Sequence, residues 1–476
     1  MPVPDIKEEA GGHPPLVSVK GQLPRRVSGV SLHEVYPQTP GLGARDAYER
    51  IRAELTRATD LVHSAHPGQR GVSLPVVADD REAWQLIVQL FDPAIPWLDL
   101  TAWNPDPKPA APSSIIRLDV ARPFPLHLAS PEKFRHTLAW VDTNIKLGVE
   151  RMADALDLPP SVQAPLVRAC FRIYSYLLKM QDSLLVQSMN FNYSMFFQDR
   201  ILQLVSGGRA HSNDRAAREP AILANRIALD LLKGLGAISY RQLCTLSVFM
   251  GIVWASSPEL QAAHHGDADA TLSKIQAQLE SLSAHWGIDH IDRFLSDMTG
   301  KGHEFTVAVI LDDNGESVFD VAIFQRLLED NDSLRVVFIL NAYGVSNNMA
   351  VDSLRDITRE DYFAPLRRHV DSGTVTFCIE RQPFRSFEPA WLRPSTREAL
   401  RTAPFCYVKG VNFFETLQMP ANVRYHCFTV HGQTCAALTG CQEGAGVFAR
   451  LPPGVVGYDY RSAEEVRTLA ETVAWK

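Results

Sequence analysis

One stretch decides the fold of this chain: Val309-Ile310-Leu311-Asp312-Asp313-Asn314-Gly315-Glu316-Ser317-Val318-Phe319-Asp320. The run from Thr306 to Leu311 is short, apolar and rich in β-branched side chains, which predicts a strand buried on both faces. From Val318 to Leu328 the apolar residues recur at helical spacing with charges between them, which predicts a helix. A buried strand, a short turn and a helix together form the repeating unit of an α/β sheet.

Two adjacent acids, Asp312 and Asp313, follow the predicted strand at its carboxyl end. Ligands of open α/β sheets bind just outside this end of the strands, and carboxylate oxygens are the ligands that Mg²⁺ and similar hard cations prefer. Gly315 lets the backbone come close to a bound ligand. A second interpretation stays open, because acids in a first helical turn also stabilise the helix by interacting with its dipole.

Polar residues follow two more predicted strands further along the chain. The apolar run from Leu334 to Leu340 leads into Gly344-Val345-Ser346-Asn347-Asn348-Met349-Ala350-Val351-Asp352. The run from Phe405 to Val408 leads into Lys409-Gly410-Val411-Asn412-Phe413-Phe414-Glu415-Thr416-Leu417. Three strand ends in succession thus offer acids, amides and a lysine, and this pattern favours a ligand site over a simple helix cap.

In these segments the sequence resembles the damage-control metal-dependent phosphatases. This family includes the acidic-residue-methyltransferase-like branch and is also known as the domain of unknown function eighty-nine. Its first motif is Asp-Asn-Ala-Gly-Glu with an Asp four residues later, and it resembles residues 312–316 with Asp320. Its second, Asn-Asp-Ala-Thr followed by an Asp, resembles residues 347–350 with Asp352, and its third, Lys-Gly-Gln-Gly-Asn-Tyr-Glu-Thr-Leu, resembles residues 409–417. The resemblance covers roughly residues 300 to 450.

The resemblance implies a site for one divalent metal ion, which could be Mg, Mn, Co, Ni or Fe. Its implied ligands are Asp312, Asp313 and Asn348, and the implied phosphate-binding residue is Lys409. The predicted catalytic residues are Asp312, Asp313 and Lys409, and the predicted substrate-binding residues are Lys409, Gly410, Asn412, Asn347 and Glu316. This chain has Asp at 313 where the family has Asn, and Asn at 348 where the family has Asp. Thr434 stands where the family often has a basic residue.

The predicted function is therefore metal-dependent hydrolysis of a small phosphorylated metabolite, with water as the nucleophile. Two alternatives stay open. In the first, the altered motifs mark an enzyme of the same fold that was recruited to a specialised pathway with another chemistry. In the second, the chain keeps the fold as a non-catalytic scaffold. The substrate, the metal and the oligomeric state are not fixed by the sequence.

Composition excludes some other classes of protein. The chain has 476 residues, of which 46% are hydrophobic, and this is enough for a large buried core. A formal net charge of −7 provides no basic face, so no nucleic-acid partner is predicted. We found no apolar run long enough for a membrane span and no secretory signal, so we expect a cytoplasmic protein without a membrane partner. The seven cysteines lack metal-ligand spacing and are predicted to be buried small hydrophobes.

The predicted fold class is α/β, with an N-terminal all-helical domain ahead of a three-layer, Rossmann-like C-terminal domain. The predicted boundaries are a Pro/Gly-rich arm at 1–44, a mainly helical domain at 45–300 and a metal-binding catalytic domain at 301–476. Helical periodicity is found at Ala44–His66, Phe134–Leu156, Val162–Gln187, Pro220–Leu235 and Ala268–Ser283. The aromatic and amide cluster at Met189–Arg200 is either core or the lining of a pocket, and His264–Asp269 is predicted to be a solvated loop.

Overall fold

The structure is a computed structural model. It describes residues 29–65, 74–91, 131–180, 191–206, 215–236, 238–256, 285–299, 302–342, 344–345, 347–382, 384–387, 392–416, 422–431, 435–436 and 439–453. The sequence predictions for Ala268–Ser283 and His264–Asp269 lie outside these residues. Within the described part of the chain, no helix is long and apolar enough to cross a membrane.

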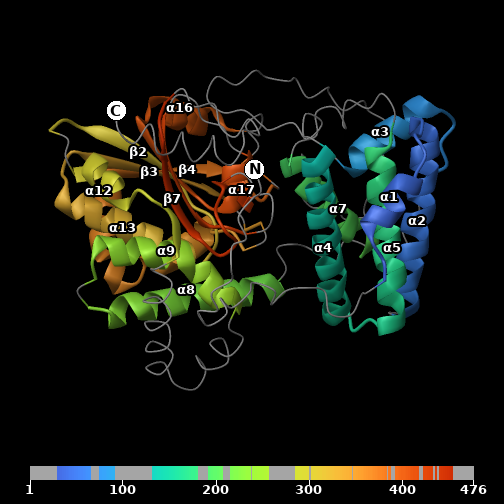
Figure 1. Ribbon diagram of the computed structural model, residues 1–476, viewed down its shortest axis with the longest axis horizontal. Helices are drawn as coiled ribbons and strands as arrows, with labels where there is room; N and C mark the ends of the chain where they lie inside the picture. The colour runs from blue at the N-terminus through green and yellow to red at the C-terminus, as the bar shows by residue number, and fades with distance from the viewer. Residues whose placement is uncertain are drawn as a thin grey trace, which may run out of the picture.

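The N-terminal part consists of helices packed around their own apolar core (Figure 1). They are α1 (Leu32–Gln38), α2 (Ala44–Ala65), α3 (Asp80–Leu90), α4 (Pro131–Ala155), α5 (Pro160–Leu178) and α7 (Phe191–Val205). The aromatic and amide cluster predicted around residues 189–200 forms most of α7, and Phe196 and Phe197 are buried in the core. Leu32 and Leu42 are also buried there, so the described end of the predicted arm is packed rather than extended.

The C-terminal part contains a seven-stranded sheet in the order β1-β7-β6-β5-β2-β3-β4. The strands are β1 (Trp286–Asp289), β2 (Phe305–Ile310), β3 (Leu334–Asn341), β4 (Val375–Glu380), β5 (Phe405–Lys409), β6 (Val423–Thr429) and β7 (Gly446–Leu451). Every neighbouring pair is parallel except β6 and β7. The predicted fold class is confirmed. The sequence analysis identified β2, β3 and β5 but not the two edge strands, β1 and β4.

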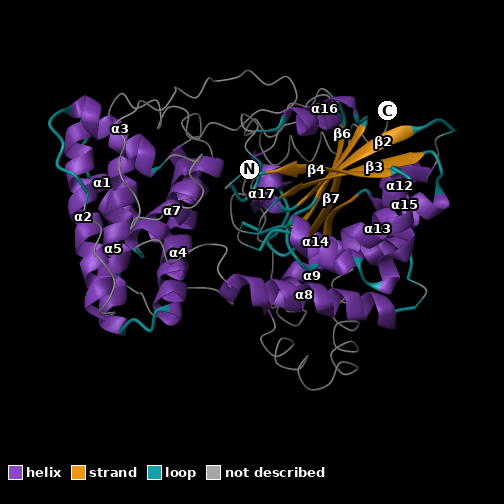
Figure 2. Cartoon of the chain, turned by 180° about the vertical axis from the view of Figure 1, so that it is seen from behind, coloured by secondary structure: helices purple, strands orange, loops and turns teal. Residues whose placement is uncertain are grey.

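Helices cover both faces of this sheet (Figure 2). On one face the sheet shares a core with α8 (Arg215–Gly234), α9 (Tyr240–Ser256), α12 (Ile291–Thr299), α13 (Glu316–Asp330), α14 (Val351–Thr358), the 3₁₀ turn η3 (Asp361–Phe363) and α15 (Ala364–Asp371). On the other face are α16 (Pro394–Thr402) and α17 (Val411–Thr416). Alternate residues of β2 enter the two cores, Val307 and Val309 on one side and Ala308 and Ile310 on the other. This explains why the strand is apolar throughout.

Strand order places the predicted site residues at one point of the sheet. From β2 the chain continues outward to β3 and β4, whereas β5 lies on the opposite side of β2 and leads to β6. The direction of winding therefore reverses between β2 and β5, and ligands of open α/β sheets bind in the crevice at such a reversal. Asp312 follows the end of β2, and Lys409 is the last residue of β5.

Residues 384–387, which follow β4, connect the two parts of the molecule. Phe384 is buried in the core of the N-terminal helices, where its ring lies 5.6 Å from that of Phe196 on α7. The guanidinium of Arg385 forms an ion pair with Asp199 of α7, with 2.8 Å between Nη2 and Oδ1. Phe387 instead packs on Phe413 of α17, with ring centroids 5.1 Å apart. These contacts attach α7 to the loops beyond the carboxyl end of the sheet.

Candidate active site

The turn after β2 is shaped by close packing on its neighbours. Gly315 has φ +83° and stands at the N-cap of α13, where a Cβ atom would meet the Cβ of Ala224 on α8 at 3.1 Å. The turn is also tied to the loop after β3, because the N–H of Asn314 donates to the carbonyl of Asn347 at 2.8 Å and the N–H of Met349 donates to that of Asp312 at 2.5 Å. The first two sequence motifs are therefore held side by side by their backbones.

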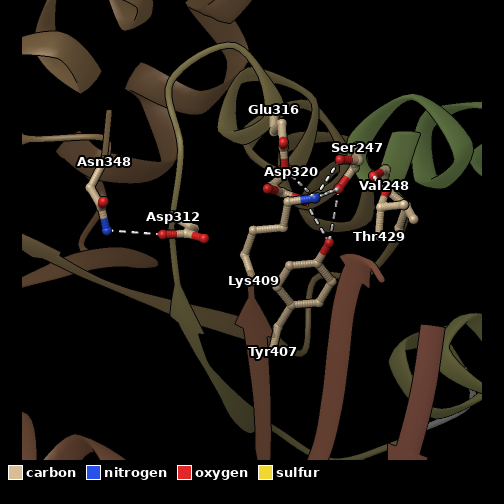
Figure 3. A network of polar contacts seen from close by, with 9 residues as sticks. All are labelled: Ser247, Val248, Asp312, Glu316, Asp320, Asn348, Tyr407, Lys409 and Thr429. Carbon is tan, nitrogen blue, oxygen red and sulfur yellow. Dashed lines mark hydrogen bonds and ion pairs between the residues drawn. The ribbon is translucent and has the colours of Figure 1, made fainter. Parts of the chain in front are cut away.

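Asp312 is 6% exposed and lies between the other two motifs. Its Oδ1 accepts a hydrogen bond of 2.9 Å from the side-chain nitrogen of Asn348, as Figure 3 shows. Its Oδ2 lies against Gly410, which has φ +93°, and a Cβ at that position would be only 1.6 Å from the oxygen. Only glycine permits this approach, so the glycine of the third motif makes room for the acid of the first.

Asn348 donates a second hydrogen bond, of 2.7 Å, from the same nitrogen to the backbone carbonyl of Arg385. Both partners of this nitrogen are acceptors, which fixes the orientation of the amide. Its nitrogen, not its oxygen, faces Asp312. For Asn348 to bind a metal ion through its oxygen next to Asp312, the amide would therefore have to rotate.

Lys409 is fully buried, and its ammonium group lies in a polar network beneath the turn (Figure 3). It forms an ion pair of 2.9 Å with Glu316 in the first turn of α13. It also donates to the backbone carbonyl of Ser247 on α9 and contacts the hydroxyl of Ser247 at 3.3 Å. Ser247 was not identified from the sequence, because it lies in the apolar helix α9, which carries no motif.

The same network contains Asp320, which is fully buried one helical turn beyond Glu316. Its Oδ1 accepts hydrogen bonds of 2.5 Å from the hydroxyl groups of Ser247 and Tyr407. Tyr407 is on β5, two residues before Lys409, so its ring lies on the same face of the strand as the lysine. Asp320 thus joins α9, α13 and β5 beneath the site.

Burial of several carboxylates together raises their pKa values. Burial, followed by the charges of Asp313 and Glu316, raises the pKa of Asp312 well above its usual value. Burial and the charge of Glu316 raise the pKa of Asp313 to about 7, although Lys409, Arg385 and a hydrogen bond from the side chain of Asn347 act in the opposite direction. Burial alone would lower the pKa of Lys409, but the carboxylates of Glu316 and Asp320 outweigh it, and the pKa is raised. The site carries excess negative charge that a cation would relieve.

The residues of this site fit a hard divalent cation, but the protein provides only some of the ligands that such an ion needs. Among the described residues, no group of three or more His, Cys, Asp or Glu side chains is arranged to hold a metal ion. The available donors, Asp312 and Asp313, are carboxylates, which suit hard ions such as Mg²⁺ or Mn²⁺. A mixed set of two carboxylates, an amide or backbone oxygen and substrate or water oxygens would satisfy such an ion.

The structure brings most of the predicted site residues together. Asp312, Asn348 and Gly410 are in contact, Glu316 is paired with Lys409, and Asp313 bridges to Asn348 through its backbone. Asn412 lies in α17 next to this group and is half-buried. Residues that the sequence analysis did not assign to the site include Ser247, Tyr407, Arg385 and Asn225 on α8. Most come from elements without a motif, so no local signal identified them.

Comparison with known proteins agrees with this description. Residues 239–447 match the model of the damage-control phosphatase ARMT1-like domain. The crystal structure of a DUF89 family protein from Pyrococcus horikoshii is similar, with a TM-score of 0.50 and 14% identity, covering 68% of this chain and 98% of that chain. At this identity the likeness concerns the fold alone. A comparison with curated proteins gave no match. The match begins at residue 239, so it includes α9, which supplies Ser247. Because of this match, residues 239–447 are a damage-control phosphatase ARMT1-like domain.

Proposed function

We propose that the protein is a divalent-metal-dependent phosphatase that hydrolyses a small phosphorylated metabolite. The observation that supports this most directly is the meeting of buried acids and a buried lysine at the carboxyl ends of β2 and β5. Asp312 and Asp313 would hold the ion, with Asn348 as the third ligand after rotation of its amide. When bound, the ion would neutralise phosphoryl oxygens and orient them for displacement.

Lys409 would bind the phosphate, but its three N–H groups already have acceptors. These are the carbonyl and the hydroxyl of Ser247 and the carboxylate of Glu316. A phosphate oxygen can therefore be bound only in exchange for one of them. Glu316 has a side chain that is 16% exposed, while Ser247 is fully buried, so Glu316 is the partner that a phosphate would displace. Asn347, Gly410 and Asn412 would complete the phosphate site.

Of the two carboxylates that would hold the ion, that of Asp313 is also the better placed to orient the attacking water. Its side chain is half-buried, whereas Asp312 is 6% exposed and is held by Asn348. Positioning and electrostatic stabilisation provide most of the catalysis in phosphoryl transfer, so a water-orienting carboxylate needs only to be well placed. We also propose a cytoplasmic location. The predicted domain limit at residue 300 does not coincide with the limit between the two cores, because α8, α9 and α12 share the core of the sheet.

The test is phosphate release by purified protein stripped with a chelator, over a panel of phosphomonoesters with Mg²⁺, Mn²⁺, Co²⁺, Ni²⁺ or Fe²⁺. We expect metal-dependent turnover that Asp312→Asn reduces by at least about 100-fold, because a preorganised charge at the reacting group is lost. Asp356→Asn, which removes an exposed partner of Arg359 outside the three motifs, is the matched control and should keep full activity. Full activity in Asp312→Asn would refute the assignment.

If no ester of the panel releases phosphate, a measurement of metal binding would separate the two alternative functions. If the wild-type protein binds metal in calorimetry but releases no phosphate, the recruited enzyme with another chemistry is favoured. If it neither binds metal nor releases phosphate, the non-catalytic scaffold is favoured.

A further inference from the structure

Asn225 lies on α8, upstream of the residues that match the phosphatase domain, yet its side chain bonds to the turn after β2. Its amide nitrogen donates to Oδ1 of Asn314 at 2.9 Å, and its oxygen accepts from the N–H of Gly315 at 2.7 Å. Asn225 is 5% exposed and Asn314 is 6% exposed, so both hydrogen bonds are shielded from water. A single side chain therefore fixes two successive residues of the first motif.

Asn314 extends this contact to the second motif. Its side-chain nitrogen donates to the backbone carbonyls of Asn347 at 2.7 Å and Asn348 at 3.1 Å. Its oxygen is the group that Asn225 holds. A relay of two amides thus runs from α8 through the loop after β2 to the loop after β3. These are the loops that carry Asp312, Asp313 and Asn348.

The two loops need such a connection because of the charges they carry. Asp312 is buried and the adjacent Asp313 is half-buried, so their two carboxylates repel each other with little screening by water. Repulsion of this kind tends to move the carboxylates apart and to open the turn. Metal and catalytic side chains must be held within about 0.5 Å of their working geometry, and this depends on the residues that support them.

We propose that Asn225 is a positioning residue for the metal-binding side chains, acting on them through Asn314. The proposal rests on the metal site of the proposed function, but it concerns geometry and not the reaction. Asn225 contacts neither Asp312 nor Lys409 in any hydrogen bond that the structure describes, so it would not touch a substrate. Helix α8 would thereby become part of the active-site framework, although it lies outside the matching domain.

The first test measures Mn²⁺ affinity by calorimetry for the full-length protein and for Asn225→Ala. We expect binding to weaken by about 10- to 100-fold, the usual effect of removing a residue that supports metal ligands. Asn422→Ala is the matched control. Asn422 is 1% exposed and donates to the carbonyl of Leu400 at 2.7 Å, but it precedes β6 at the other end of the sheet. This variant should lose stability and keep the wild-type affinity for Mn²⁺.

Asn225→Asp gives a sharper test and covers the case in which the alanine variant does not fold. The variant keeps the acceptor for Gly315 and nearly the same shape, but it places an acceptor against the oxygen of Asn314. It also adds a negative charge, which by electrostatics alone would tighten Mn²⁺ binding. The proposal requires weaker binding in spite of that charge. Unchanged or tighter binding in Asn225→Asp would overturn it.

A double-mutant cycle tests the relay itself. If Asn225 acts through Asn314, the double alanine variant should bind Mn²⁺ no more weakly than Asn314→Ala alone. Additive losses would overturn the relay.

Mn²⁺ affinity is measured without turnover, so these tests are separate from the test of the proposed reaction. If the protein binds Mn²⁺ but hydrolyses nothing, the proposed phosphatase activity is refuted, and the role of Asn225 in metal binding can still be tested. Wild-type affinity in Asn225→Ala refutes the role of Asn225 and leaves the phosphatase standing. A wild-type protein that binds no Mn²⁺ overturns both the metal site and this proposal.

Discussion

Lys409 shows how single residues are constrained in this site. Its ammonium group is fully buried and is paired with Glu316, while the carboxylate of Asp320 lies nearby and acts on its pKa. A buried charge is tolerated only when partners replace the water it has lost, and here two carboxylates and Ser247 do so. The lysine therefore holds the acids of α13 in place in addition to its proposed role with phosphate.

Lys409→Met should destabilise the protein as well as abolish activity. Removing one partner of a buried ion pair leaves uncompensated charge and typically costs about 3 to 5 kcal/mol in the free energy of unfolding. Urea denaturation of the metal-free protein measures this change. Lys233→Met is the matched control, because Lys233 forms an exposed pair with Glu360 and its loss should cost about 1 kcal/mol or less. Equal losses in both variants would contradict the structural role of Lys409.

The raised pKa of Asp313 predicts that metal binding depends on pH. Its pKa in the folded protein is raised to about 7, above the value of about 4 expected in an unfolded chain. The folded state therefore binds this proton more tightly than the unfolded state, and the stability it provides is lost as pH rises from about 4 to about 7. Because a metal ion requires the carboxylate, the gain in Tm on adding Mg²⁺ should be larger at pH 8 than at pH 6.

Thermal unfolding with and without Mg²⁺ at several pH values tests this expectation. Asp313→Asn should keep the fold and lose the part of the pH dependence that comes from this carboxyl. A gain in Tm that is the same at pH 6 and pH 8 would contradict the assignment of Asp313 as a ligand.

At the scale of elements, the segment 384–387 after β4 joins two cores. Phe384 belongs to the core of the N-terminal helices, whereas Phe387, three residues later, packs in a core of the sheet. The carbonyl of Arg385 holds Asn348, and its guanidinium pairs with Asp199 of α7. Movement of α7 relative to the sheet would therefore be transmitted to the loop after β3.

Phe384→Ala should weaken the attachment of the N-terminal helices. Truncating a buried phenylalanine typically costs about 3 to 5 kcal/mol, because the lost burial is accompanied by a cavity. We expect the thermal transition of the helices to shift to lower temperature in scanning calorimetry. Phe377→Ala provides the matched control, since Phe377 on β4 is 40% exposed and should lose much less. If the two variants unfold alike, Phe384 does not couple the cores.

At the scale of the whole molecule, two separate cores predict two unfolding transitions. The helices from α1 to α7 form one core, and α8 and α9 share the other with the sheet. All proposed metal ligands lie in the second unit. Binding to the folded state stabilises only the unit that binds, by about 2.7 kcal/mol when the free metal is at 100 times its Kd.

Calorimetry of the full-length protein should therefore show that Mn²⁺ raises the transition of the sheet unit. The transition of the N-terminal helices should move much less, by an amount that reflects their coupling through residues 384–387. Asp312→Asn should show the same two transitions without the metal-dependent shift. A single transition that Mn²⁺ shifts as a whole would show that the chain unfolds as one cooperative unit.

The sequence alone determined the elements that follow from local pattern. The buried strands β2, β3 and β5 are apolar on both faces, so they were predicted within about two residues, and the polar residues after them identified the three loops. The edge strands β1 and β4 were missed because they are short or partly exposed and lack that pattern. The prediction that all seven cysteines are buried is confirmed.

Only the tertiary structure decided which side chains meet. Strand order brought Lys409 beside Glu316, and packing of α8 and α9 brought Asn225 and Ser247 to loops far away in the sequence. The orientation of the Asn348 amide was fixed by the carbonyl of Arg385, on a different loop. These contacts depend on how distant elements pack in three dimensions, whereas periodicity and motif spacing describe only neighbours along the chain. The sequence could therefore propose the residues of the site, and the packing determined their partners.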